Sequence, residues 1–258
     1  MRPSLFLLKK SGSSNRWLAR QQSDPFVNSR SSSGRYRSRA SYKLLQLAER
    51  YPHILPAGGT IVDLGCAPGG WAQVAADKVG KRGRVIGVDL LPVRDLGEGY
   101  EQVSFIQGDF LSPEIYQQLV KTLPRRSSAR NVEVDAVLSD MMANMTGVRI
   151  RDVENSLELC RSALMFAVHY LRRPTAGGEP TPERPLPPSS RKGGNLVLKH
   201  FAHPDFSLFK KTELEPIFDR VHYVKPESSR SESSEGFFVC LGFRPERGRP
   251  GKIDGTVS

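Results

Sequence analysis

Cysteine is scarce in this chain of 258 residues, which has only Cys66, Cys160 and Cys240. An odd and widely spaced set of three does not build a disulfide framework, and no two of them have the spacing of metal ligands. The cysteine content therefore favours a reducing compartment.

Long apolar runs are also absent. No segment approaches the roughly 20 consecutive apolar residues that a membrane-spanning helix needs, so we expect no membrane span. The composition, 38% hydrophobic and 25% charged, is that of a globular protein with some unpacked chain. The length suits one domain of roughly 200 residues with appendages, or two small domains.

Acidic residues are outnumbered: 27 Asp and Glu stand against 38 Lys and Arg, and the net charge is +11. An excess of this size favours a polyanionic partner, most often nucleic acid. Residues 1–40, however, hold nine of the basic residues and a single acid, Asp24. Much of the charge argument therefore belongs to the N-terminus, where a targeting segment or simple solubility is the alternative.

The first 23 residues contain no acid, are rich in Arg and Ser, and have a short apolar patch at 5–8. This composition is typical of a mitochondrial transit peptide, and the apolar patch is too short for a secretory signal. We predict a leader over residues 1–30 and localisation in the mitochondrial matrix. A basic arm that contacts RNA is the alternative. The folded domain is expected over 31–245, followed by a flexible tail, 246–258.

Short apolar runs between glycines and prolines predict seven strands. They are Thr60–Leu64, Arg84–Asp89, Val103–Gln107, Val134–Leu138, Asn195–Lys199, Val221–Val224 and Gly236–Gly242. Helical periodicity predicts helices from Ser38 or Ser41 to Tyr51, at Trp71–Val79 and Pro113–Thr122, from a cap at Asp152 to about Leu171, and at Phe206–Phe218. The alternation predicts an α/β fold, a mostly parallel sheet with helices on both faces. Only the last two strands, too close in sequence for a helical crossover, are expected to be antiparallel.

Residues 172–194 contain six prolines and four glycines, which predicts an exposed loop or insertion. Just beyond it, His200 and His203 form an H-x-x-H pattern. No further Cys or His lies at a suitable spacing, so we expect these two to be loop residues and predict no metal site.

A glycine-rich turn follows the first predicted strand, in the sequence VDLGCAPGGW at 62–71. Its glycines, Gly65, Gly69 and Gly70, allow a ligand to approach the backbone, and the next helix offers free N–H groups at its start. The turn lacks the Gly-Lys-Ser/Thr of a Walker A loop, and its spacing is not G-x-G-x-x-G.

Acids mark the ends of the first three predicted strands: Asp63, Asp89 and Asp109. Asp89 is placed to accept hydrogen bonds from ribose hydroxyls, and Asp109 from an adenine amino group. With the glycine turn, this set suits an adenosine ligand with an amino-acid tail, which is S-adenosylmethionine. The structural alternative is that these acids only form turns at the strand ends.

Several motifs together resemble the FtsJ-like family, the heat-shock-type ribosomal RNA 2′-O-ribose methyltransferases. They are VDLGCAPGGWAQVA at 62–75, DPFV at 24–27, YRSRASYKL at 36–44, LSDM at 138–141, LVLK at 196–199, and KPESSR at 225–230 with Ser234-Glu235. The resemblance covers about residues 17–245 and implies a seven-stranded Rossmann-like methyltransferase fold. The sequence departs from the family in Cys66, which stands where small residues are usual, and in the 172–194 insertion. We expect the Cys66 thiol to serve packing.

The family uses a Lys-Asp-Lys-Glu tetrad, which the resemblance transfers to Lys43, Asp140, Lys199 and Glu235. It gives Lys199 the central part, orienting a ribose hydroxyl and taking or stabilising its charge. Asp140 would hold Lys199, Lys43 would be a neighbouring cation, and Glu235 would align Lys43 or the ribose. For the lysines, a solvated surface ion pair is the structural alternative. The predicted cofactor site comprises Asp63, Gly65, Pro68, Gly69, Gly70, Trp71, Asp89, Asp109 and Asp140.

The resulting hypothesis is S-adenosylmethionine-dependent 2′-O-methylation of a uridine in mitochondrial large-subunit ribosomal RNA by a monomer. Within this class, tRNA, cap structures or cytosolic and nucleolar ribosomal RNA are alternative substrates. A non-catalytic ribosome-assembly factor is a second class, which the intact tetrad disfavours. A small-molecule methyltransferase is a third. The basic stretch Arg30–Arg39 beside Lys43 argues against it, because a small substrate needs no surface that tracks phosphates.

Overall fold

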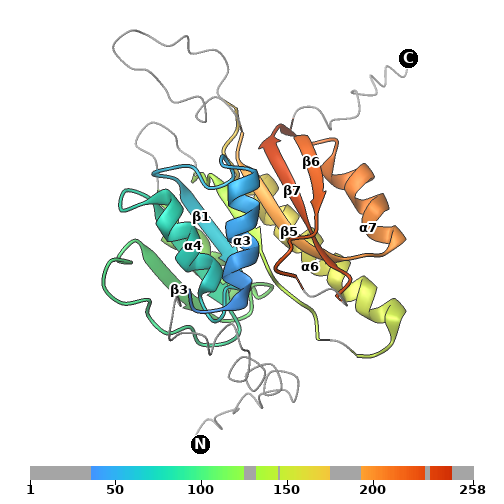
Figure 1. Ribbon diagram of the computed structural model, residues 1–258, viewed down its shortest axis with the longest axis horizontal. Helices are drawn as coiled ribbons and strands as arrows, with labels where there is room; N and C mark the ends of the chain where they lie inside the picture. Colours follow the sequence, from blue (N-terminus) through green and yellow to red (C-terminus); the bar gives the residue numbers. More distant parts are fainter. Residues whose placement is uncertain (1–35, 125–131, 145, 175–192, 230–232, 246–258) are drawn as a thin grey trace, which may run out of the picture.

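A computed structural model describes residues 36–124, 132–144, 146–174, 193–229 and 233–245. Its centre is one seven-stranded sheet with the order β3-β2-β1-β4-β5-β7-β6 (Figure 1). The strands are β1 (Thr60–Leu64), β2 (Arg84–Asp89), β3 (Val103–Gln107), β4 (Ala136–Ser139), β5 (Asn195–Phe201), β6 (Phe218–Val224) and β7 (Glu235–Phe243). β1 to β5 pair in parallel, and β7 is antiparallel to both β5 and β6. The fold is the predicted Rossmann-like methyltransferase fold.

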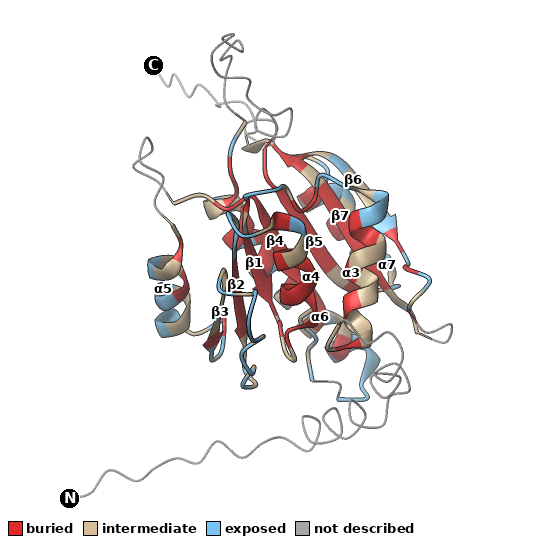
Figure 2. Ribbon diagram, turned by 60° about the vertical axis from the view of Figure 1, so that its left-hand side comes forward, coloured by how far each residue is buried: buried red, intermediate tan, exposed pale blue. Residues whose placement is uncertain are grey.

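Helices cover both faces of the sheet (Figures 1 and 2). They are α3 (Arg39–Arg50), α4 (Gly70–Val79), α5 (Pro113–Thr122), α6 (Arg149–Tyr170), α7 (Pro204–Phe209) and the π-helical turn η3 (Lys210–Leu214). One apolar cluster joins α3 and α4 to one face, and a second joins α5, α6 and α7 to the other. Because the central strands are buried on both sides, they read as continuous apolar runs rather than as alternating ones. Within the described ranges, no helix is long and apolar enough to cross a membrane.

Most predicted elements agree with the structure to within two residues, but the start of α6 does not. α6 begins at Arg149 after Val148, and Asp152 lies in its first turn instead of capping it. The Asp152 carboxylate accepts hydrogen bonds from the amides of Thr146 and Gly147 and from the Thr146 hydroxyl. Asp152 therefore holds the loop that leads into the helix.

The helical segment predicted at 206–218 begins two residues earlier and ends four residues earlier than predicted. α7 begins at Pro204, η3 follows it directly, and the chain has entered β6 by Phe218. Pro216 lacks an amide hydrogen and cannot continue a helix, so the helical segment ends before it.

The predicted loop at 172–194 is too wide. Arg172 is buried and its guanidinium contacts Asp135 at 2.9 Å, while the Gly194 amide donates to the Arg172 carbonyl. Both ends of the segment therefore belong to the folded body. Residues 175–192 lie outside the described residues, as do the predicted leader at 1–30 and the tail at 246–258.

Candidate active site

Lys199 and Asp140 form an ion pair at the edge where β4 and β5 end. The Lys199 ammonium lies 2.9 Å from the Asp140 carboxylate and 2.7 Å from its backbone carbonyl. Asp140 follows β4, and its amide donates to the carbonyl of Leu64 at the end of β1. The Lys199 side chain is only 8% exposed, and the ion pair fixes its ammonium beside the end of β4.

Lys43 and Glu235 form a second pair at the same edge. The Lys43 ammonium of α3 lies 2.5 Å from the carboxylate of Glu235 at the start of β7. The same carboxylate oxygen accepts a hydrogen bond from the hydroxyl of Ser229, 3.1 Å away. Ser229, which is buried, fixes Glu235 from the other side; sequence reasoning missed this residue.

Phe237 connects the two pairs. It is opposite Lys199 in the β5–β7 register, and the Lys43 ammonium lies 5.9 Å from its ring centre. Glu235 is two residues from Phe237 on the same strand and therefore points to the same face as Lys199. The structure thus brings all four predicted tetrad residues to one side of one sheet edge. Their catalytic roles stay predictions.

The glycine turn leaves no room for side chains at its closest point. A Cβ on Gly65 would lie 2.8 Å from the amide nitrogen of Met141, and the φ angle of Gly65 is +78°. Gly69 precedes α4 with a φ angle of +101°. Both angles are in the left-handed region that favours glycine. The turn therefore packs closely on Met141 at Gly65 and needs glycine at both positions.

Asp89 links the end of β2 to this turn. One carboxylate oxygen accepts from the Ala67 amide at 2.8 Å and the other from the Leu91 amide at 2.8 Å. Burial raises the pKa of Asp89, and these two amides oppose the rise. The carboxylate is held in place by the backbone, with lone pairs remaining for ligand hydroxyls.

Asp63 is fully buried, and neither of its carboxylate oxygens has a hydrogen-bond partner among the described residues. Burial, followed by the neighbouring charges of Asp140 and Asp89, raises the pKa of Asp63 well above its usual value, and the opposing effect of the Ala72 amide is smaller than any of these. An orphaned carboxyl beside two more acids fits a ligand that carries positive charge. S-adenosylmethionine, with a sulfonium and an ammonium group, meets this requirement.

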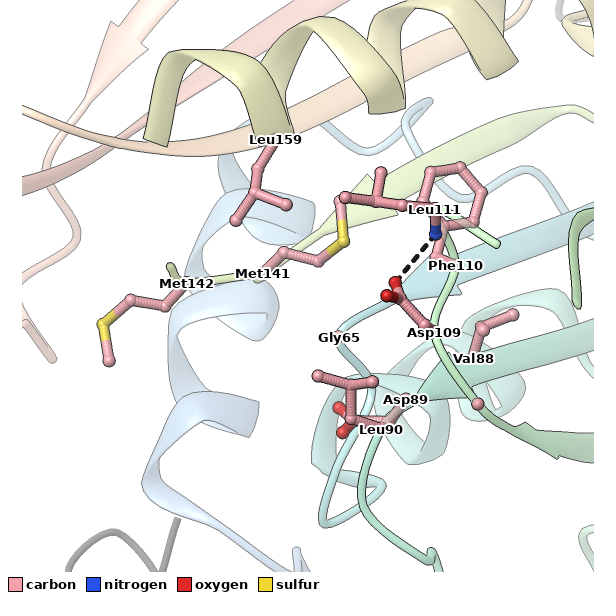
Figure 3. Close-up of a pocket in the computed structure, with 11 residues that line it drawn as sticks. Gly65, Val88, Asp89, Leu90, Asp109, Phe110, Leu111, Met141, Met142 and Leu159 are labelled. Carbon is pink, nitrogen blue, oxygen red and sulfur yellow. Dashed lines mark hydrogen bonds between the residues drawn. The ribbon is translucent and has the colours of Figure 1, made fainter. Parts of the chain in front are cut away.

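A pocket opens between the ends of β1, β2, β3 and β4 (Figure 3). Figure 3 shows the carboxylates of Asp89 and Asp109 in the pocket together with the apolar side chains of Met141 and Leu159. Asp109 accepts from the Leu111 amide at 2.9 Å. The residues that line the pocket are Gly65, Val88, Asp89, Leu90, Gly108, Asp109, Phe110, Leu111, Met141, Met142 and Leu159. The sequence predicted Gly65, Asp89 and Asp109 but not the apolar residues. The apolar residues lie within two positions of an acid, except Leu159, which lies on α6 and looks like ordinary helix surface.

Other predicted cofactor residues serve the frame of the turn. The Trp71 side chain is buried, its ring lies tilted against that of Phe237, and its indole N–H donates to the Ala40 carbonyl at 2.7 Å. Trp71 therefore anchors the start of α4 against α3. A Cβ on Gly70 would collide with the hydroxyls of Ser38 and Ser41, which shows close packing of α3 on α4. Pro68 lies within the turn after a cis peptide bond.

Cys66 is buried in the turn. Burial, with the carboxylates of Asp63 and Asp89 nearby, raises the pKa of its thiol well above the ordinary value. The thiol therefore stays protonated and serves packing, in agreement with the sequence analysis.

One expectation about polar residues needs correction. His200 is not a loop residue: it is buried within β5, while His203 caps α7. In the basic stretch Arg30–Arg39, Arg37 donates to the carbonyls of Arg94 and Asp95, and Arg39 donates to that of Ser228. Arg30 and Arg35 lie outside the described residues, and contact of this stretch with phosphates stays a prediction.

No group of three metal-binding side chains occurs in the part of the chain that the structure describes. A sheet of this order, with a glycine turn after β1 and acids at the strand ends, defines an S-adenosylmethionine-dependent methyltransferase.

Comparison with known proteins agrees. The model of the FtsJ-like methyltransferase family matches residues 36–243. A protein named ribosomal RNA large subunit methyltransferase E, from Pseudomonas aeruginosa, is 37% identical over 239 residues, 93% of this chain and 100% of its own. Its namesake from Coxiella burnetii is 38% identical over 230 residues, 89% of this chain and 95% of its own. The crystal structure of a ribosomal RNA methyltransferase from Plasmodium falciparum has a TM-score of 0.61 and 27% identity, covering 81% of this chain and 98% of that one. The chain belongs to the FtsJ-like methyltransferase family, and its cofactor is S-adenosylmethionine.

Proposed function

We propose that this methyltransferase modifies the 2′-oxygen of a ribose in RNA, and that its target is a uridine of mitochondrial large-subunit ribosomal RNA. The observation that carries the proposal is the Lys199–Asp140 pair, fixed beside the cofactor turn and next to the Lys43–Glu235 pair. A ribose hydroxyl is a weak nucleophile and needs a positioned group of this kind.

Each of the four residues has a separate role in the proposed methyl transfer. The cofactor supplies a methyl group on a sulfonium, an electrophile that is attacked in line. For this step Lys199 acts as the neutral amine, after its ammonium has released one proton to solvent. Its lone pair orients the 2′-hydroxyl and takes up the hydroxyl proton as the new carbon–oxygen bond forms and the bond between the methyl carbon and sulfur breaks. Asp140 holds the Lys199 nitrogen by accepting its two remaining N–H groups through the carboxylate and the backbone carbonyl. Glu235 holds Lys43, whose positive charge faces the developing negative charge on the hydroxyl oxygen.

Three features support the choice of substrate and compartment. The relatives from Pseudomonas and Coxiella are named as large-subunit ribosomal RNA methyltransferases. Without residues 1–30 the chain keeps 32 Lys and Arg against 26 Asp and Glu, and this net charge of +6 suits a polyanionic substrate. Residues 1–30 have the composition of a mitochondrial leader, which supports action in the matrix. We propose that the chain acts as a monomer.

The test is a map of 2′-O-methylated nucleotides in mitochondrial and cytosolic ribosomal RNA from cells with and without the protein. We expect one uridine of the mitochondrial large-subunit RNA to lose its methyl group and to regain it when the wild-type gene is restored. Restoration with the Lys199→Ala variant should fail. Loss of a site in tRNA or cytosolic ribosomal RNA would overturn the substrate, and an unchanged map would overturn the activity.

A further inference from the structure

His200 lies next to Lys199 in β5 and on the opposite face of the sheet, where it stacks on Phe238 with ring centres 3.8 Å apart. The His200 Nδ1 atom is 3.1 Å from the carbonyl oxygen of Phe201. A carbonyl only accepts, so Nδ1 carries the proton and Nε2 has the free lone pair. His200 is only 4% exposed, and no described residue donates to Nε2. Burial lowers the pKa of His200 to about 4, which keeps the ring neutral at neutral pH.

A hollow of about 920 Å³ opens beside His200. Its walls include Phe206 of α7 and Tyr223 of β6, and Lys210 and Lys211 of η3 stand at its rim. Tyr223 is 50% exposed. Lys210 pairs with Glu215, whereas Lys211 is exposed and forms no ion pair with a described residue. We call this hollow the β5–α7 pocket.

The β5–α7 pocket lies at the same edge of the sheet as the candidate active site. β6 and β5 are both antiparallel to β7, so they run in the same direction and their carboxyl ends coincide. Tyr223 is near the end of β6, and the segment His200–Pro204 leaves the end of β5. Lys199 and His200 are consecutive in β5, so they face opposite sides of the sheet near this edge.

The chemistry of the pocket suits a nucleotide. A neutral imidazole nitrogen without a donor requires an N–H group, which every RNA base carries on its Watson–Crick edge. An exposed aromatic ring such as Tyr223 offers a face on which a base stacks. Lysine ammonium groups at the rim complement a phosphate. A protein segment would offer the N–H but would not need the lysines.

We propose that the β5–α7 pocket binds one nucleotide of the RNA substrate next to the nucleotide that is methylated, with a base N–H donated to His200, the base on Tyr223 and a phosphate at Lys211. The proposal rests on the proposed function, since it takes the substrate to be RNA. It assigns to this face of the sheet a role in choosing the sequence or the bend of the RNA around the target.

Three variants test the pocket in binding assays with an RNA fragment that spans the methylated site. His200→Phe keeps a ring and removes the acceptor, and we expect RNA affinity to fall about 3- to 10-fold. Tyr223→Ala should weaken binding about tenfold through lost stacking. Lys211→Ala should lower the slope of log affinity against log salt by about 0.7, the value for one phosphate of a single strand. Lys121→Ala, an exposed lysine on α5, is the matched control.

Steady-state kinetics distinguish a residue that binds RNA in the pocket from one that takes part in methyl transfer. All three variants should raise KM for RNA, leave kcat within about twofold, and leave affinity for S-adenosylmethionine unchanged. His200 is buried, so the His200→Phe protein can be less stable than wild type. If it does not fold, the variants at the exposed positions Tyr223 and Lys211 carry the test. RNA affinity and salt slope equal to wild type in both exposed variants would overturn the proposal.

A second measurement does not depend on methylation. The Nε2 resonance of His200 is followed by ¹⁵N NMR during titration with the four ribonucleoside monophosphates at millimolar concentrations. We expect the resonance to shift with a nucleotide whose base has an N–H, and to shift less with N6,N6-dimethyl-AMP or N3-methyl-UMP, which lack it. If nucleotides shift the His200 resonance but the wild type methylates no RNA, the pocket binds nucleotides, the proposed function fails, and the placement of the pocket beside a methylated nucleotide fails with it. If it methylates RNA and no nucleotide shifts His200, the pocket proposal fails alone.

Discussion

Lys199 is the least exposed of the four tetrad residues, and its ammonium is held by both the side chain and the backbone of Asp140. A merely structural lysine would strengthen this end of the sheet and nothing more. A lysine that activates the substrate would matter to the reaction rate even where the fold is intact. Substitution separates these two roles.

Lys199→Ala should lower the methyl transfer rate by about 10²–10⁴-fold while cofactor affinity stays near wild type, because a positioned base acts mainly on kcat. Lys199→Arg should fail as well, since a guanidinium stays protonated and has a different shape. Single-turnover assays on folded protein with a cognate RNA check this, with Lys121→Ala as control. A rate within about threefold of wild type would exclude the catalytic role of Lys199.

Asp63 makes the stability of the cofactor-free protein depend on pH. Burial and two neighbouring carboxylates raise its pKa in the folded state, so the folded chain keeps a proton that the unfolded chain releases above about pH 4. Stability falls with rising pH wherever the folded state binds more protons. This contribution is therefore absent at low pH and becomes more unfavourable toward neutral pH.

Asp63→Asn removes the titration while keeping the shape. Its melting temperature without cofactor should exceed that of wild type by an amount that grows as pH rises from about 4 to 7. Thermal unfolding at several pH values measures the difference, and Asp95→Asn, an exposed carboxylate, should show no such trend. A difference that is constant across this range would mean that Asp63 ionises normally.

At the scale of elements, the strands were predicted well because their signal is local. β1 and β2 are short apolar runs with an acid as the last residue but one or the last residue, before glycines or a turn, and no tertiary contact is needed to recognise them. The start of α6 was predicted poorly because Asp152 has the residue type of a cap, and only the structure shows it bound to Thr146 and Gly147. Local pattern does not distinguish these two uses of an aspartate.

The candidate site shows the same division. The family resemblance predicted which residues gather at the sheet edge and that Asp140 holds Lys199. For Glu235 it left two partners open, Lys43 or the ribose, and the structure shows the contact with Lys43. Ser229 and the apolar lining at Met141 and Leu159 were missed, because their meaning comes only from distant segments that the fold brings together.

The turn between β1 and α4 is tested by a matched pair of glycines. Gly58 and Gly65 both have left-handed φ angles, +72° and +78°, but a Cβ meets nothing within 4 Å at Gly58 and the Met141 backbone at Gly65. Gly58→Ala should cost about 1 kcal/mol through backbone strain alone. Gly65→Ala should cost more and should abolish cofactor binding, because Met141 must move away from the pocket.

Chemical denaturation measures the two stabilities, and calorimetry with S-adenosylmethionine measures the affinities. The Gly58→Ala protein should bind cofactor like wild type, which makes it the control for strain. Equal stability losses in the two variants, with cofactor binding kept in both, would contradict a close approach of Met141 to the turn.

At the scale of the whole molecule, the cofactor pocket, the tetrad and the β5–α7 pocket all lie at one edge of the sheet. The cofactor pocket lies at the ends of β1 to β4, the tetrad between α3 and β5, and the β5–α7 pocket around the end of β5. The basic residues are distributed differently. Residues 1–30 carry six of them and a single acid, and they precede the first described element, α3. That separation suits a segment whose task is transport rather than catalysis.

Residues 1–30 fused to a fluorescent reporter should therefore direct it into mitochondria, where the negative interior draws in positive charge at about 2.3 kcal/mol per charge and 100 mV. The matched control replaces the basic residues of this segment, Arg2, Lys9, Lys10, Arg16, Arg20 and Arg30, with Gln. The control fusion should stay outside, because its length and apolar patch are unchanged but the driving charge is gone. Fluorescence microscopy with a matrix marker, and protease protection of isolated mitochondria, provide the measurement. A reporter that stays in the cytosol or enters the nucleus would exclude the matrix as the site of action and would make the segment a basic arm for RNA. The salt dependence of RNA binding would then decide its role, since an arm that contacts phosphates adds to the slope and a leader does not.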